Sequence, residues 1–113
     1  MAYDEKLAGR VREALAHIRG IEEKKMFRGI TFMVKGKMCV SVSGNELMCR
    51  VNPAQHDELL EKKGCREMIH GGKTMKGFIY VSPEGIKAKK DFEFWINLCL
   101  EFNKKAKASK KRS

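Results

Sequence analysis

The chain has 113 residues, of which 42% are hydrophobic and 34% are charged, and its formal net charge is +10. This size and composition suit one ordinary globular domain with a charged surface. No apolar run approaches the ~18 residues that a membrane-spanning helix needs, and the N-terminus lacks the apolar core of a secretory signal. We therefore expect a cytoplasmic protein that makes no contact with a membrane.

The positive charge is concentrated at the C-terminal end. Residues 104–113 contain no acid and six basic residues, which are Lys104, Lys105, Lys107, Lys110, Lys111 and Arg112. Removing these six charges leaves only +4 for residues 1–103. We expect a folded domain over residues 1–103 and a basic tail over residues 104–113, where no large apolar side chain could hold the segment down.

The first predicted element is an amphipathic helix over residues 4–18. Its apolar residues recur at helical spacing, and they are Leu7, Val11, Ala14, Leu15 and Ile18. Asp4 suits the N-cap position, and Gly20 suits a helix stop.

Residues 25–51 alternate between apolar and polar side chains with a period of two, which predicts three antiparallel strands. The turns fall near Lys35-Gly36 and Gly44-Asn45. For the first turn, we expect a three-residue loop or a bulge. A three-residue loop would pair Val34 with Met38 and Phe32 with Val40, whereas a two-residue loop would pair Phe32 with Cys39 and misalign the two apolar sets.

The second turn suits a two-residue type II′ loop. This register pairs three apolar couples on one face: Val42 with Leu47, Val40 with Cys49, and Met38 with Val51. It places Cys39 and Cys49 on opposite faces of the sheet. The alternative is a three-residue loop that would set these two cysteines opposite each other.

In the second half of the chain we predict two more helices, with strand residues between them in the sequence. Asn52 and Pro53 suit the start of a short helix over residues 53–63. Residues 64–76 are polar, with room for a short strand at 67–69, and a further strand covers 78–81. A turn at 82–85 precedes a long helix over residues 89–105, whose apolar stripe is Phe92, Trp95, Ile96, Cys99 and Phe102.

Together these elements predict an α+β fold. An antiparallel sheet of about four to five strands would carry an N-terminal helix, a short middle helix and a long C-terminal helix packed on it.

Residues that could support catalysis or metal binding do not form a known pattern. The four cysteines contain no CxxC pair and favour free thiols. The three histidines lie far apart, and HGGK at 70–73 lacks the ending of a phosphate loop and suits a turn. We expect no catalytic site, no cofactor and no metal.

Two stretches resemble a known family. Residues 24–40 read KKMFRGITFMVKGKMCV and residues 75–81 read MKGFIYV. Together with the N-terminal MAYDEKLAGRVREAL, they resemble the N-terminal domain of the TfoX/Sxy competence regulators over residues 3–103. The motif positions, which we expect to be structural, are Met26, Phe27, Gly29, Gly36, Met38, Lys76 and Gly77. Arg28 replaces a glycine of the family, either as a tolerated side chain or as a basic surface contact.

The resemblance implies a regulatory or adaptor role. The two-domain competence regulators act as transcriptional co-activators beside a cyclic-AMP receptor protein. Because this sequence has a lysine-rich tail where the second domain would follow, we expect a stand-alone relative. Its partner would be a protein, such as a component of the transcription machinery.

Three functional hypotheses follow. The first is protein binding through the sheet or a groove beside it, where the numerous methionines serve either as core filler or as an adaptable binding surface. The second is weak, sequence-independent nucleic-acid binding by residues 104–112. The third is a small-molecule binder or an enzyme of unknown type.

Overall fold

The computed structural model describes residues 3–26 and 29–105. Its elements, in chain order, are α1 (Glu5–Ala14), β1 (Ile21–Met26), β2 (Gly29–Val34), β3 (Lys37–Ser43), β4 (Glu46–Arg50), a 3₁₀ turn (Pro53–Gln55), α2 (His56–Leu59), β5 (Cys65–His70), β6 (Lys73–Val81), α3 (Pro83–Ile86) and α4 (Lys89–Lys105).

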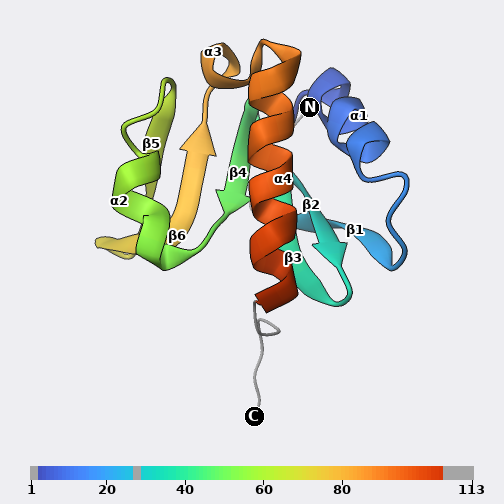
Figure 1. The fold of residues 1–113 in the computed structure, drawn as a ribbon, viewed down its shortest axis with the longest axis horizontal. Helices are drawn as coiled ribbons and strands as arrows, with labels where there is room; N and C mark the ends of the chain where they lie inside the picture. Colours follow the sequence, from blue (N-terminus) through green and yellow to red (C-terminus); the bar gives the residue numbers. More distant parts are fainter. Residues whose placement is uncertain (1–2, 27–28, 106–113) are drawn as a thin grey trace.

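The strands form one antiparallel sheet in the order β1-β2-β3-β4-β6-β5. Helix α4 runs across the middle of the sheet, with α1 and α2 on either side of it (Figure 1). The predicted α+β fold is confirmed, although six strands replace the expected four to five. The strand missed entirely is β1, because its residues 22–25 are exposed charges at a sheet edge and show no apolar alternation.

Helix α1 is capped as predicted but is shorter. The Asp4 carboxylate accepts hydrogen bonds from the backbone N–H groups of Lys6 (2.8 Å) and Leu7 (3.3 Å). The helix ends at Ala14 and not at residue 18. The N–H of Ile18 donates to the carbonyl of Leu15, and this tight turn redirects the chain towards β1.

The β2–β3 hairpin contains the predicted bulge. Lys35 and Gly36 form a two-residue turn with φ of 54° and 77°, so Val34 faces Lys37 and not Met38 as expected. The register then shifts, and Phe32 faces Val40 as predicted.

This bulge changes which face two neighbouring side chains occupy. The predicted pairs of Val42 with Leu47 and Val40 with Cys49 are confirmed. The pair of Met38 with Val51 is wrong, because the bulge turns Met38 to the opposite face. For the same reason the expectation that Cys39 and Cys49 lie on opposite faces of the sheet is wrong, because both belong to the core beneath the helices.

The segment from residue 53 to residue 86 differs most from expectation. Asn52 caps its first turn as predicted, accepting from the N–H of Ala54 at 2.9 Å. The predicted helix over 53–63 shrinks to the 3₁₀ turn and the single turn of α2. Residues 64–76 are mostly strand, because β5 and β6 form a hairpin around a turn at 71–72. The predicted turn at 82–85 is the short helix α3.

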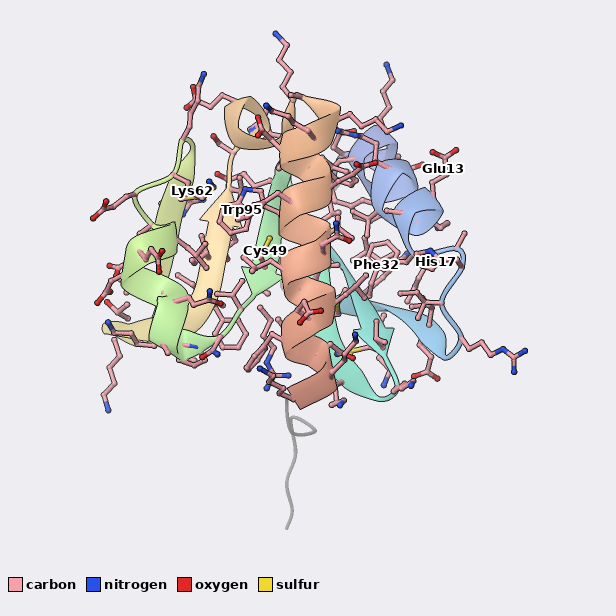
Figure 2. The ribbon with its side chains drawn as sticks, in the orientation of Figure 1. Glu13, His17, Phe32, Cys49, Lys62 and Trp95 are labelled. Atoms are coloured by element: carbon pink, nitrogen blue, oxygen red, sulfur yellow. The ribbon has the colours of Figure 1, made fainter. Side chains whose placement is uncertain are left out.

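The main core lies between the helices and the sheet. From α4 it receives Phe92, Trp95, Ile96 and Cys99, all less than 5% exposed, as the apolar stripe predicts. In Figure 2, Trp95 of α4 and Cys49 of β4 are labelled on the same side of that helix. Burying each large apolar side chain contributes about 1.5–3 kcal/mol, so α4 fixes the helical layer on this side of the sheet.

Candidate functional site

The sheet carries a second apolar cluster on the face away from the helices. We call it the methionine face, and its residues are Met33, Met38, Met48, Met68, Phe78 and Tyr80. All of them come from strands, whereas all four helices contribute to the main core. Within the described residues, therefore, no helix contributes an apolar side chain to this cluster.

Cross-strand pairing assembles the methionine face. Met33 faces Met38 across β2 and β3, and Met48 faces Tyr80 across β4 and β6. The three methionines of the central strands are at most 7% exposed, and Met68, Phe78 and Tyr80 are half-buried around them. Thioether side chains are flexible and polarizable, so such a surface can adapt its packing to a bound partner.

An ion pair borders the methionine face. The Arg66 guanidinium lies 4.4 Å from the centroid of the Tyr80 ring and is paired with the carboxylate of Glu46. This arrangement combines a cation–π contact with a salt bridge, so it holds the Tyr80 ring in place at the border.

A second cluster joins α2 to the β5–β6 hairpin. His56 is fully buried, and its Nδ1 accepts the backbone N–H of Gly77 at 3.0 Å. Its Nε2 lies 3.4 Å from Oε2 of Glu67. The exposed Asp57 is near enough for the three side chains to surround an ion.

The hydrogen bonding of His56 disfavours a metal at this cluster. Because Nδ1 accepts an N–H, the proton of the neutral ring belongs on Nε2, which then donates to Glu67. No lone pair remains on Nε2 for a metal. Asp57 is also engaged, since its carboxylate accepts from Nζ of Lys76 at 2.9 Å. The cluster is best explained as a structural link between α2 and the hairpin.

The four cysteines are free thiols, and the surroundings of Cys39, Cys65 and Cys99 make these three poor nucleophiles. Burial raises the pKa of Cys39, and the adjacent Cys99 adds to this effect. The hydrogen bond with Cys49, together with burial, holds the pKa of Cys99 above its ordinary value. Burial raises the pKa of the half-buried Cys65 to about 11. Near neutral pH the reactive thiolate is therefore scarce at these three positions.

Comparison with known proteins identifies the family. The model of the TfoX N-terminal domain matches residues 13–103. The chain belongs to the TfoX N-terminal domain family. This confirms the resemblance seen in the sequence. Neither the search of curated proteins nor that of solved structures returned a match.

In this TfoX N-terminal domain, two of the motif glycines have clear structural reasons. A Cβ at Gly29 would overlap the carbonyl oxygen of Val42 on the adjacent strand, so β2 and β3 could not keep their spacing. Gly77 has φ of 91°, donates its N–H to His56 and accepts the N–H of Val51. A side chain at either position would disturb the sheet.

The other motif positions are spread over the fold. Gly36 lies in the β2–β3 turn, Met38 on the methionine face, and Lys76 beside Asp57. Met26 ends β1, where its backbone pairs with Gly29. Phe27 and the neighbouring Arg28 lie outside the described residues. The motif residues that the structure describes therefore do not lie together in one site.

The basic residues of the TfoX N-terminal domain are described only in part. Lys104 and Lys105 are exposed in the last turn of α4. Lys107, Lys110, Lys111 and Arg112 lie outside the described residues. No helix among residues 3–26 and 29–105 is long and apolar enough to cross a membrane.

The sequence indicated the methionines as a candidate binding surface, but it did not predict which of them lie on the same face of the sheet. The bulge in the β2–β3 hairpin could not be placed from the sequence, and without this bulge Met38 would face the helices. Period-two alternation alone could have found Met33 and Met48 together, since both have core neighbours on either side in the sequence.

Proposed function

We propose that this TfoX N-terminal domain is a regulatory or adaptor domain that binds a protein partner through the methionine face. One observation carries the proposal: six apolar residues from five strands gather on a face of the sheet to which no described helix contributes. An apolar sheet face is stabilised when a second layer packs on it. A partner protein that presents apolar side chains would supply that layer.

The composition of the methionine face favours an adaptable protein contact. Methionine side chains repack easily, and surfaces rich in them accept partners of different shape. Met68, Phe78 and Tyr80 are the half-buried members, so a partner would contact them first. Membership of the family of competence regulators supports a role in regulation, with the transcription machinery as the source of the partner.

The experiment is an affinity capture from the native cytoplasm with matched variants. Met68→Lys places a charge on the methionine face. Ile69→Lys places the same charge on the next residue of β5, which is 59% exposed and lies outside that face. We expect one defined protein to be captured by the original chain and by Ile69→Lys, and to be lost with Met68→Lys.

Circular dichroism should show that both variants keep the fold, and the identified protein should then bind the purified chain directly. Equal capture by Met68→Lys and the original chain would refute the methionine face as the binding surface. Absence of any specific partner for the original chain would refute the adaptor role itself.

Sequence-independent nucleic-acid binding by residues 104–112 is a second proposal, supported by the six basic residues there and by the exposure of Lys104 and Lys105. Each phosphate contact releases counterions, so affinity for DNA should fall steeply with salt. A variant with glutamine at the six basic positions should lose most of that affinity. Unchanged affinity in this variant would rule out the tail as the contact.

A further inference from the structure

A pocket of about 550 Å³ lies on the helical side of the sheet. It forms where the α1–β1 connection, the β2–β3 turn and the C-terminal half of α4 meet. We call it the basic pocket, and its lining residues are His17, Ile18, Val34, Lys35, Lys37, Asn97, Leu100, Glu101, Asn103 and Lys104. Figure 2 shows His17 on the connection that follows α1.

The backbone holds the walls of the basic pocket together. The N–H of Lys35, in the β2–β3 turn, donates to the carbonyl of Gly20 in the α1–β1 connection at 3.1 Å. Val34, at the end of β2, is only 3% exposed. The pocket is thus formed before any ligand arrives, and its volume lies within the range of small-molecule sites, about 300–1,000 Å³.

Asn103 lines the pocket and carries a buried, unsatisfied polar group. Its side chain is 5% exposed, and Nδ2 has no hydrogen-bond partner among the described residues. Burying an amide donor without a partner destabilises a protein, so such a group needs an explanation. A ligand atom that accepts a hydrogen bond would satisfy Asn103.

The charges around the pocket indicate the sign of that ligand. Lys35, Lys37 and Lys104 are positive, and the only acidic residue among the lining side chains is Glu101, whose carboxylate lies 3.8 Å from Nζ of Lys104. The net charge of the lining is therefore +2 with His17 neutral. An oxyanion could take hydrogen bonds from both the ammonium groups and the amide.

Three further lining residues, Ile18, Val34 and Leu100, are apolar. A ligand that carries an apolar body next to its anionic group would bury both parts. A second pocket, near the start of α1, contrasts with this one. There Asp4 and Glu84 stand among Lys6, Arg10 and Lys87, so that pocket favours no particular ligand charge.

We propose that the basic pocket binds a small amphipathic anion, with a carboxylate or phosphate group towards Asn103 and the lysines and an apolar body against Ile18, Val34 and Leu100. This site is separate from the methionine face, on the other side of the sheet. The proposal therefore stands whether or not a protein partner binds there.

Octanoate and octyl phosphate are suitable probes for the full chain, followed by ¹H–¹⁵N NMR. We expect saturable shifts at the amides of residues 17–20, 34–37 and 97–104. Acetate, which lacks the apolar body, and octanol, which lacks the charge, should bind much more weakly. The stronger of the two octyl probes identifies the anionic group. Shifts confined to residues 105–113, or no saturable shifts, would overturn the proposal.

Asn103→Leu separates a binding role from a structural one. Leucine has the same number of side-chain heavy atoms as asparagine but no polar atoms, so the variant should be more stable, with a Tm higher by about 4 °C or more. It should also bind the preferred probe about tenfold more weakly or worse, because a hydrogen bond to a charged group is lost. A more stable variant with unchanged affinity would exclude Asn103 from the site.

The charge contribution has its own control. Lys35→Gln combined with Lys37→Gln should weaken probe binding several-fold, and the loss should shrink at high salt. Lys73→Gln removes one positive charge from the start of β6, near the opposite edge of the sheet. If Lys73→Gln weakens binding as much as the double variant does, the basic pocket is not the binding site.

Discussion

Single residues in this fold have distinct physical roles, and the glycines show the contrast most clearly. Gly29 lies where β2 passes so close to β3 that a Cβ would overlap the Val42 carbonyl oxygen and come within 2.9 Å of its carbon. Gly9 lies in α1, where an added Cβ would meet nothing within 4 Å. The same substitution should therefore have opposite effects at the two positions.

Gly29→Ala should lower the free energy of unfolding by at least about 2 kcal/mol, because backbone atoms must move apart. Gly9→Ala should raise it by up to about 1 kcal/mol, because alanine has the higher helix propensity. Urea denaturation of the two variants beside the original chain measures both changes. A Gly29→Ala variant as stable as the original would contradict the close packing of β2 on β3.

His56 allows a test of its hydrogen bond separately from its packing. His56→Leu leaves the N–H of Gly77 buried without an acceptor, which should cost about 1–3 kcal/mol of unfolding free energy. In His56→Asn, Oδ1 takes nearly the position of Nδ1 and can accept the same N–H. Thermal denaturation should rank the asparagine variant above the leucine variant, and the reverse order would disprove the role of Nδ1 as acceptor.

At the scale of elements, regular periodicity made some predictions secure. The apolar stripe on α4 and the alternation in β2, β3 and β4 come from side chains that are buried on one face of each element. The spacing of apolar residues in the sequence therefore predicts whether each of these elements is a helix or a strand. Strand β1 and the outer half of the β5–β6 hairpin lie towards the edges of the sheet. Their side chains include the exposed Glu22, Lys24 and Lys73, which do not pack into a core. The sequence of these segments therefore contains no apolar pattern that distinguishes a strand from a loop.

The composition of the methionine face depends on the position of the β2–β3 bulge, which the pattern of side chains in the sequence does not specify. Sequence reasoning predicted a bulge or longer loop near Lys35-Gly36 but could not locate the extra residue. Its location in β3 determines that Cys39 enters the core and Met38 the methionine face. Asn103 was missed for another reason: a polar residue at the end of an apolar stripe usually lies in solvent.

An ion pair connects α1 to the edge strand β1 and predicts a pH dependence. The Arg12 guanidinium donates to both carboxylate oxygens of Glu23, at 2.7 Å and 2.9 Å, and this hydrogen bonding holds the pKa of Glu23 below its ordinary value. A lowered pKa in the folded state means that the pair stabilises the fold above the unfolded-state pKa of about 4.3. The stabilisation is lost as the pH falls through the lower folded-state value.

Arg12→Gln should therefore lower the free energy of unfolding by about 0.2–1 kcal/mol at pH 7, a small effect because the pair is largely exposed. The difference from the original chain should shrink as Glu23 becomes protonated in acid. Adding Glu23→Gln to this variant should cost little more at pH 7. Urea denaturation at pH 7 and pH 3 checks this, and a difference that grows in acid would contradict the pairing.

At the scale of the whole molecule, the two sides of the sheet have different roles. The helices cover one side and build the main core and the basic pocket, whereas the other side carries the methionine face. A protein partner on the methionine face would complete a second layer. An anion in the basic pocket would contact both α4 and the β2–β3 turn, and so would stabilise the helical layer.

Photo-crosslinking, with photo-methionine incorporated into the chain in its native cell, tests binding through the methionine face most directly. The reactive group then sits at the surface that we propose as the binding site. We predict that mass spectrometry will map crosslinks between one partner protein and Met68, the half-buried methionine of that face. A partner crosslinked only through Met1, Met26 or Met75, with none through the methionine face, would contradict binding at that face.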